Sequence, residues 1–253
     1  MSHAGTKTVA LVQARMGSTR FPGKMLADLG GHSLLEWVLR RVRQARLVDT
    51  VVLATTELSR DDALADLAEN LRVEVFRGSE TDVLGRFAAA AGKFKADIVV
   101  RICADNPFVD PTEVDRLVRH FAENECDYAC NHQNRLGSGY ADGFGAEILS
   151  AALLAQVAAT TRESRHREHA TLFLWDHASE YRLSAVVAPI DLAFPALRFD
   201  VDTPNDLASL EALVRAGVTI ETPAKDVIKI AQEQVCRRLA SADFSESKTE
   251  DPK

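Results

Sequence analysis

The sequence contains no uninterrupted apolar run that approaches 18 residues, so it offers no candidate membrane-spanning helix. Residues 1–7 also lack the apolar core of a signal peptide. Basic residues are in deficit, because 30 Lys and Arg stand against 37 Asp and Glu, a formal net charge of −7. That balance argues against general binding to nucleic acid or to anionic membranes, since both select for excess positive charge. We therefore expect a soluble, cytoplasmic protein.

Cysteine is scarce as well. The four cysteines, Cys103, Cys126, Cys130 and Cys236, include no Cys-x-x-Cys pair, and no histidine pair follows them at the spacing of a zinc finger. We expect reduced thiols rather than a structural zinc site or a disulfide framework. With 253 residues, the chain is long enough to bury a core without covalent cross-links.

Two familiar phosphate-binding motifs are absent. A Walker A loop has four residues between its glycines and Ser or Thr after its Lys. Here five residues separate Gly17 from Gly23, and Met25 follows Lys24. The Gly-x-Gly-x-x-Gly fingerprint of dinucleotide-binding folds does not occur either. The sequence is therefore neither that of a P-loop NTPase nor that of an obvious dehydrogenase.

What the sequence does contain is an alternation of short apolar runs with longer helical patterns. Strand-like runs occur at 8–12, 50–54, 73–76 and 97–102, and each is followed by a helical pattern. Ser33 and Glu36 form a capping box that opens the first helix. This order predicts an α/β protein: a Rossmann-like, three-layer fold with a mainly parallel sheet and helices on both faces.

Residues 131–145 do not follow this alternation. They are polar, carry four glycines and show no clear periodicity, which is typical of a functional loop. Beyond them the pattern predicts helices at 150–159 and 165–177, strands at 181–187 and 197–201, and a helix that starts at Thr203-Pro204. We expect one domain over residues 7–238, with an inserted lid or dimerisation segment at about 131–187. A disordered tail is expected over 239–253.

Three cations cluster in the loop after the first expected strand. Residues 13–24 place Arg15, Arg20 and Lys24 among two glycines, a serine and a threonine. Rossmann-like sheets bind ligands at the carboxyl ends of their strands. Glycines let backbone N–H groups approach a phosphate and the cations neutralise its charge, so the loop predicts a polyphosphate site. A solvated basic loop is the alternative.

Carboxylates accompany the ends of two later strands. Asp105 follows the strand at 97–102, and Asp200 and Asp202 lie at the end of the strand at 197–201, where alternation places both on the same side. Carboxylate oxygens are ligands that Mg²⁺ prefers. Together with the basic loop, they predict Mg²⁺ bound to a nucleoside triphosphate. A turn cap at Asp105 and a helix cap at Asp202 are the alternatives.

The run at 13–24 resembles the opening signature of the cytidylyltransferases that activate acidic sugars, and most closely their SpsF-like branch. Acylneuraminate and 3-deoxy-manno-octulosonate cytidylyltransferases are more distant relatives. The resemblance continues in order through residues 78–86, 104–107, 167–169 and 200–204. It implies transfer of CMP from CTP to a sugar or sugar-acid acceptor, with release of pyrophosphate, in the synthesis of surface polysaccharide or glycan precursors. A homodimer and an Mg²⁺ cofactor are implied as well.

The same resemblance implies residue roles. The triphosphate is expected to contact the loop residues Ala14, Arg15, Gly17, Ser18, Arg20 and Lys24. The base or ribose is expected to contact Ser79, Asp82 and Arg86, although Arg86 could equally be a helix-face arginine. The metal is expected on Asp105 and Asp202, with Asp200 in support. Arg15, Lys24, Asp105 and Asp202 are the catalytic candidates.

The acceptor is left open by the sequence. Arg135, Arg162, Arg165 and Arg167 could meet a carboxylate, and Arg167, His169 and Asp142 fall where such enzymes meet the second substrate or the dimer partner. The SpsF-like branch has an acidic residue where this chain has Gly145. Two other functions stay possible: a nucleotidyltransferase of the same fold for another base or a non-sugar acceptor, and a non-catalytic nucleotide-binding module.

Overall fold

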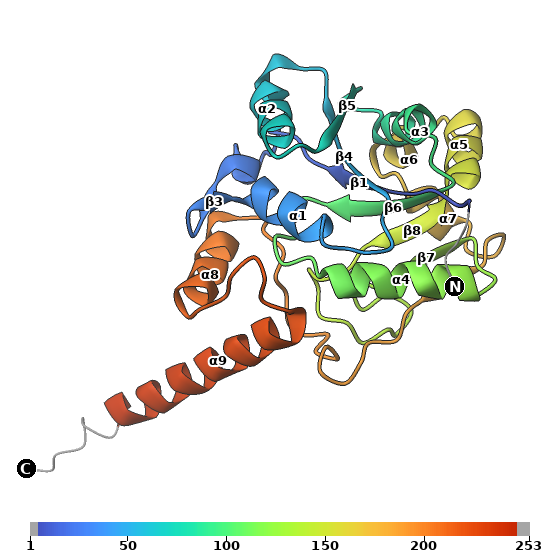
Figure 1. Ribbon diagram of the computed structural model, residues 1–253. Helices are drawn as coiled ribbons and strands as arrows, with labels where there is room; N and C mark the ends of the chain where they lie inside the picture. Colours follow the sequence, from blue (N-terminus) through green and yellow to red (C-terminus); the bar gives the residue numbers. More distant parts are fainter. Residues whose placement is uncertain (1–4, 247–253) are drawn as a thin grey trace, which may run out of the picture.

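A seven-stranded sheet forms the centre of the molecule, with helices on both of its faces (Figure 1). The computed structural model describes the backbone of residues 5–246 and the side chains of residues 5–236. The strands, in spatial order, are β5 (Glu74–Gly78), β4 (Thr50–Thr56), β1 (Thr8–Gln13), β6 (Ile98–Cys103), β8 (Glu147–Ser150), β7 (Tyr128–Cys130) and β9 (Leu183–Ala185). A short hairpin of β2 (Asp28–Leu29) and β3 (His32–Ser33) stands apart from the sheet.

The helices divide between the two faces. One face is covered by α1 (Leu34–Val42), α2 (Asp62–Asn70), α4 (Pro111–Glu123), α8 (Pro204–Arg215) and the start of α9 (Ala224–Glu246). The other is covered by α3 (Val83–Lys93), α5 (Ala151–Thr160) and α7 (Leu172–Asp176), with α6 (Ser164–Glu168) beside α3. Two short 3₁₀ helices, η1 (Lys24–Leu26) and η2 (Ser59–Asp61), follow β1 and β4. The three-layer α/β architecture is thus confirmed.

The sheet has a parallel half and a mixed half. Strand β1 pairs in parallel with β4 and β6, and β4 pairs in parallel with β5. The first strands are buried on both faces, which is why their sequences are almost continuously apolar. Strand β8 then runs antiparallel to both β6 and β7, an arrangement that the sequence analysis did not foresee.

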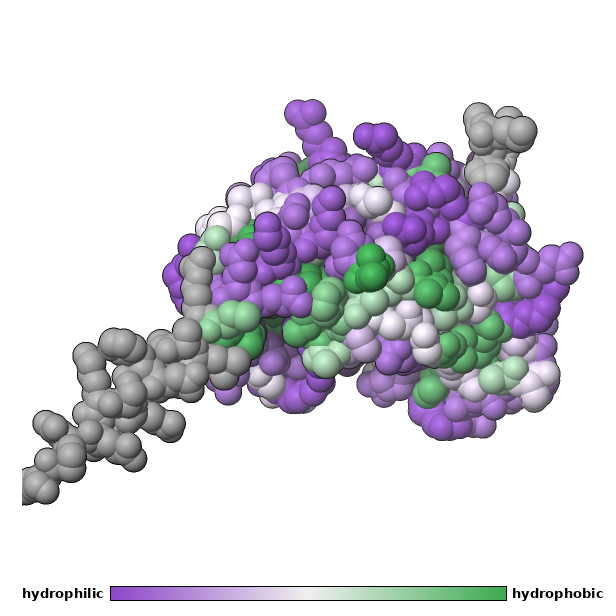
Figure 2. All heavy atoms as spheres, turned by 90° about the horizontal axis from the view of Figure 1, so that it is seen from below, coloured by the Kyte–Doolittle hydropathy of each residue, from purple (hydrophilic) through white to green (hydrophobic). Residues whose placement is uncertain are grey.

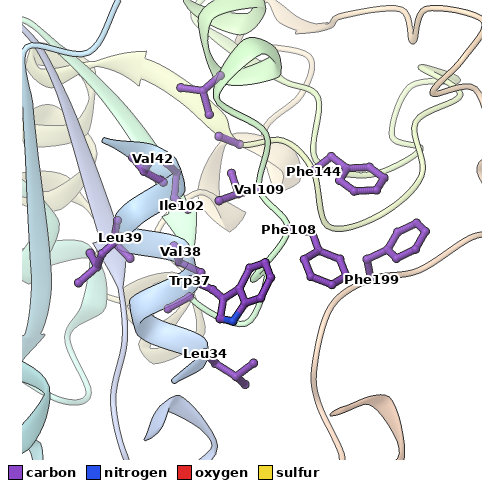
Figure 3. Close-up of a cluster of buried hydrophobic side chains, with 14 of the residues drawn as sticks. Leu34, Trp37, Val38, Leu39, Val42, Ile102, Phe108, Val109, Phe144 and Phe199 are labelled. Atoms are coloured by element: carbon purple, nitrogen blue, oxygen red, sulfur yellow. The ribbon is translucent and has the colours of Figure 1, made fainter. Parts of the chain in front are cut away.

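A cluster of aromatic side chains joins the later loops to the first helix (Figure 3). Trp37 of α1 meets Phe108 edge-on at 5.5 Å between ring centroids, and Phe199 packs 6.3 Å from Phe108 and 4.7 Å from Phe144. Phe199 is fully buried, and two residues later Val201 N donates to Asp105 O at 2.8 Å. The core therefore fixes the 199–202 segment against the loop after β6.

Several local expectations were wrong. Residues 197–201 form no strand: Phe199 and Val201 point into the core from a loop that makes one isolated bridge, Arg198 to Asp142. The helix expected at 165–177 is divided into α6 and α7, because His169 adopts an extended conformation. The strand expected at 181–187 shortens to β9.

Helix α9 continues to Glu246, and residues 247–253 of the expected disordered tail lie outside the described residues. Disorder over 239–253 stays a prediction. The division into one domain with an inserted lid or dimerisation segment at 131–187 stays a prediction.

No helix in the described chain is both long and apolar enough to span a membrane. On the face seen in Figure 2, apolar side chains form a band bordered by hydrophilic ones.

A buried arginine links helix α1 to the segments that precede α4 and α9. Arg41 of α1 donates to the carbonyl oxygens of Val109, Ile220 and Thr222 at 2.6–3.0 Å, and it lies 3.7 Å from the Asp110 carboxylate. Asp110 in turn caps α4 and accepts from Ala224 N at the start of α9. Burial lowers the pKa of Arg41 to about 10, so the side chain is still charged at neutral pH.

We expect Arg41→Met to lower the free energy of unfolding by about 3 kcal/mol or more, since removal of one partner leaves a buried charge at Asp110 uncompensated. Urea unfolding of the full chain measures this. Arg40→Met is the matched control: Arg40 is the adjacent, exposed arginine and makes only an i,i+4 pair with Glu36, so its loss should cost less than about 0.5 kcal/mol. Equal effects of the two substitutions would contradict the structural role of Arg41.

Candidate active site

The basic loop lines a cavity of about 460 Å³ at the carboxyl ends of β1 and β6. All six of the loop residues predicted for the triphosphate lie in its wall: Ala14, Arg15, Gly17, Ser18, Arg20 and Lys24. Asp105, Asp202 and His169 complete the wall from three other segments. The structure thus brings the predicted cations and the two predicted metal aspartates to one cavity.

The path of the loop is fixed by a buried carboxylate. Asp61 of η2 accepts from Met16 N at 2.7 Å and from the Thr56 hydroxyl, and it is fully buried. Gly23 then takes a left-handed conformation, with φ of 75°, where a side chain is disfavoured. The backbone turns at this point into η1, which begins at Lys24. The side chain of Lys24 points toward Asp105, which follows β6.

Lys24 lies between the two predicted metal aspartates. Its Nζ donates to Val201 O at 2.8 Å and stands 3.5 Å from Asp105 Oδ2 and 3.4 Å from Asp202 Oδ1. Arg20 pairs with Asp202 at 3.0 Å. Arg15 extends away from this group, toward Glu80 O at 3.4 Å and Glu168 at 3.9 Å. Each cation of the loop is therefore matched by an acidic or carbonyl oxygen.

The donor chemistry at Asp105 and Asp202 fits Mg²⁺. Burial raises the pKa of Asp105, Lys24 opposes that shift, and the neighbouring Asp202 and Asp200 add to it. Asp200 is engaged by Arg198 through two hydrogen bonds of 3.0 and 2.6 Å. In the described part of the chain, no three acidic, His or Cys side chains form a ready metal cluster. Two carboxylates suffice for Mg²⁺, which commonly takes its remaining ligands from substrate phosphates and water.

The residues predicted for the base form a tight structural unit beside the basic loop. Asp82 caps α3 by accepting from Gly85 N at 2.8 Å and pairs with Arg167, while its own N–H donates to the Ser79 hydroxyl. Arg86 is buried, and it donates to Ser79 O. Burial lowers the pKa of Arg86 to about 10. Ser79, Asp82 and Arg86 do not line the 460 Å³ cavity, and their contact with a base stays a prediction.

A second cavity, of about 510 Å³, adjoins the first and shares five residues with it: Arg20, Cys103, Asp105, His169 and Asp202. Beyond the shared wall it is lined by residues of the mixed half of the sheet and of the loops around it, including Arg101, His132, Arg135, Asp142, Glu147, Trp175 and Arg198. The predicted metal aspartates therefore stand where the two cavities meet.

A buried ionic network forms the floor of the second cavity. Glu147 of β8 pairs with Arg101 of β6 and accepts from Tyr128 OH at 2.5 Å and Thr171 Oγ1 at 2.8 Å. Arg101 also donates to Gln13 at 3.1 Å, which links the network to β1. The sequence analysis missed Glu147. A glutamate next to the apolar residues Ile148 and Leu149 is the signal that could have found it.

The residues left open for the second substrate separate in the structure. Arg167 pairs with Asp82, donates to Ala158 O and lines neither cavity. His169 lines both cavities and Asp142 lines the second. Burial and the nearby Asp200 raise the pKa of Asp142 to about 7, although Arg198 opposes the shift. Gly145 has no room for a side chain, since a Cβ there would lie 2.2 Å from Asn131 O.

A parallel α/β sheet with clustered cations and carboxylates at its carboxyl edge defines a nucleotidyltransferase. The profile of the cytidylyltransferase family matches residues 9–237, and the chain belongs to this family of CTP-dependent enzymes.

Three comparisons agree with that assignment. The chain is 34% identical, over 226 residues, to the spore coat polysaccharide biosynthesis protein SpsF of Bacillus subtilis, covering 87% of this chain and 92% of that one. It is 37% identical to the 3-deoxy-manno-octulosonate cytidylyltransferase of Geobacter sulfurreducens, over 46% of this chain and 45% of that one. A cytidylyltransferase structure from Leptospira borgpetersenii superposes with a TM-score of 0.84 at 29% identity, covering 91% and 96% of the two chains. The predicted SpsF-like resemblance is thus confirmed.

The Glu147 network predicts a specific acid sensitivity. Burial alone would raise the pKa of Glu147, but the charge of Arg101 and the hydrogen bonds from Tyr128 and Thr171 lower it to about 2. A depressed carboxyl pKa stabilises the fold above the unfolded value of 4.5, and this contribution is lost as pH falls toward about 2. We expect Glu147→Gln to cost roughly 3 kcal/mol at pH 7.

The difference in unfolding free energy between Glu147→Gln and the unchanged protein should shrink as pH falls below about 4.5. Urea unfolding between pH 7 and pH 3 measures it. Glu69→Gln, at an exposed position of α2, is the control and should match the unchanged protein at every pH. A difference for Glu147→Gln that stays constant with pH would contradict the assigned ionic role of Glu147.

Proposed function

We propose that this cytidylyltransferase transfers CMP from CTP to a sugar-acid acceptor, with release of pyrophosphate, in the synthesis of a surface polysaccharide or glycan precursor. The observation that carries the proposal is the position of Lys24, Asp105 and Asp202 at the junction of two cavities. The named activity of the relatives supports it, since one acts in polysaccharide synthesis and another on 3-deoxy-manno-octulosonate.

The two cavities provide for two substrates. The triphosphate is assigned to the first cavity, against Arg15, Ser18, Arg20 and Lys24, because the three cations of the loop line it. The acceptor is assigned to the second cavity, whose wall is formed by the mixed half of the sheet. The α-phosphate then lies at the shared wall, beside Asp105 and Asp202.

In the reaction, an acceptor hydroxyl oxygen attacks the α-phosphorus of CTP in line. The new bond is P–O to the acceptor, the bond to the bridging oxygen of the leaving pyrophosphate breaks, and the hydroxyl proton is released. No nucleophilic side chain is required, so positioning and charge neutralisation carry the catalysis. Arg15, Arg20 and Lys24 stabilise the negative charge that accumulates on pyrophosphate.

A charge exchange follows from the ion pairs of the site. Lys24 and Arg20 are paired with Asp105 and Asp202, and a triphosphate that binds these cations draws them away from the carboxylates. Asp105 and Asp202 then require another cation, and they would hold Mg²⁺, with Asp200 nearby in support. When bound, Mg²⁺ supplies Lewis-acid polarisation of the phosphate and lowers the pKa of a coordinated hydroxyl.

The first test removes these charges one at a time. Lys24→Met, Asp105→Asn and Asp202→Asn should each lower kcat/KM by at least about 100-fold, the usual effect of losing one preorganised charged contact. Pyrophosphate release from CTP measures this, with 3-deoxy-manno-octulosonate as the first acceptor tried.

Lys229→Met and Asp66→Asn are matched controls at exposed positions outside both cavities, and they should retain full activity. If Asp105→Asn and Asp202→Asn both retain it as well, the metal assignment is wrong.

The second test measures nucleotide binding without turnover. At 100 times its Kd, a ligand stabilises the native state by about 2.7 kcal/mol, which for a chain of this size raises Tm by roughly 5–10 °C. We expect this shift with CTP and Mg²⁺, a smaller one when EDTA is present, and little with ATP or GTP. A larger shift with a purine nucleotide would favour a nucleotidyltransferase for another base. Tight CTP binding without pyrophosphate release for any acceptor would favour a non-catalytic module.

The proposal includes a homodimer. Large apolar side chains are exposed at Leu136 and Val187, within the predicted insertion, and at Ile190 just after it, and burial of such side chains favours association. Light scattering of the purified chain tests this, since a monomer has a mass of 27.7 kDa and a dimer twice that.

A further inference from the structure

The arginines of the second cavity differ in how they are neutralised. Arg101 pairs with Glu147, Arg198 holds Asp200 through two hydrogen bonds, and Arg20 pairs with Asp202. Arg135 is the exception: among residues 5–236, no carboxylate stands within ion-pair distance of its guanidinium, and its side chain contacts the uncharged Gln133 and Trp175.

Arg135 is held in place by those two contacts. Its Nε donates to Gln133 Oε1 at 3.1 Å, and its guanidinium carbon lies 4.7 Å from the centroid of the Trp175 ring. Trp175 in turn packs edge-on against Tyr128 at 5.5 Å, and Tyr128 is anchored on the buried Glu147. Stacking on a supported aromatic ring orients the guanidinium and leaves its terminal N–H groups available.

The rest of the cavity makes this cation the natural partner of an anion. Asp142, Asp200 and Glu147 all line the cavity and would repel a negatively charged ligand placed beside them. His132 adds no positive charge at neutral pH, because burial lowers its pKa to about 4. An anionic group in this cavity is therefore favoured at Arg135.

We propose that Arg135, stacked on Trp175, binds the carboxylate of the acceptor and thereby selects acidic sugars. A guanidinium presents two parallel N–H donors that match a planar carboxylate, whereas a hydroxyl or a neutral amide takes only one of them. The proposal rests on the proposed function and adds to it the residue that reads the acceptor's charge. Arg135 is a specificity residue that binds the part of the acceptor that does not react.

The test compares Arg135→Gln and Arg135→Lys with the unchanged enzyme in pyrophosphate release, at saturating CTP and Mg²⁺. The acceptors are 3-deoxy-manno-octulosonate, N-acetylneuraminate, a neutral hexose and a hexose phosphate. For the carboxylate acceptor that turns over, Arg135→Gln should raise KM at least tenfold while kcat and the KM for CTP change less than twofold, because the lost contact is equal in the ground and transition states. Arg135→Lys keeps the charge but lacks the planar donor pair. Its KM for the acceptor should therefore lie between that of the unchanged enzyme and that of Arg135→Gln.

Arg119→Gln is the matched control, since it removes the same charge from an exposed arginine of α4 outside both cavities, and the acceptor KM of this variant should be unchanged. Tryptophan fluorescence gives a reading that is independent of turnover: Trp175 lines the cavity, whereas Trp37, the other tryptophan, is buried in the core. The sugar acid should change the emission of the unchanged enzyme with a Kd that Arg135→Gln raises at least tenfold.

Three results would overturn the proposal. An unchanged acceptor KM in Arg135→Gln would refute the role of Arg135 while leaving the proposed function intact. Turnover of the neutral hexose or the hexose phosphate in preference to both acids would refute carboxylate selection. No pyrophosphate release with any acceptor, together with normal CTP binding, would contradict the proposed function itself and this proposal with it.

Discussion

The organisation of the site depends on the convergence of Lys24, Asp105 and Asp202, which three separate segments supply. Lys24 begins η1 after β1, Asp105 follows β6, and Asp202 precedes α8. Their distances are set by the core rather than by the charges, since Phe199 packs against Phe108 and Phe144 and Val201 donates its N–H to Asp105 O. The core thus fixes the backbone positions of the three residues, so that substrate binding requires only their side chains to change partners, and fixed positions of this kind are what electrostatic catalysis needs.

The charges of the site form a balanced set. Arg15 faces Glu168, Arg20 faces Asp202, and Lys24 is shared by Asp105 and Asp202. Lys24 is the most buried of these cations, with 11% of its side chain exposed, so leaving it unpaired would be costly, whereas Arg15 and Arg20 are more exposed and their pairs contribute little to stability. On the proposed function, a polyanion would bind by exchange of partners. A metal ion that took over the released carboxylates would make the exchange favourable on both sides.

The parallel half of the sheet could be predicted because its signals are local. A strand buried on both faces is a continuous apolar run, as at 8–12 and 50–54, and the basic loop follows the first strand directly. The mixed half could not be predicted in the same way. Strand β8 has four residues and includes Glu147, whose burial is compensated by Arg101, 46 residues earlier, and by hydrogen bonds from Tyr128 and Thr171. The strand predicted at 197–201 was wrong because Phe199 and Val201 alternate as in a strand, yet they are buried from a loop.

This difference between the halves has a functional consequence. Most of the lining of the first cavity, which we propose for the nucleotide, comes from the continuous run 13–25, whose spacing is a recognisable signature, so membership of the family can be read from the sequence. The second cavity, which we propose for the acceptor, depends on pairs that are distant in sequence: Arg101 with Glu147, and Arg135 with Trp175. Arg135 and Trp175 line the second cavity and not the first, so we expect substitutions of this pair to alter the second cavity while the ion pairs of Lys24 are kept. The fold can therefore keep one chemistry at the shared wall while the acceptor changes, and acceptor identity must be sought in these long-range pairs.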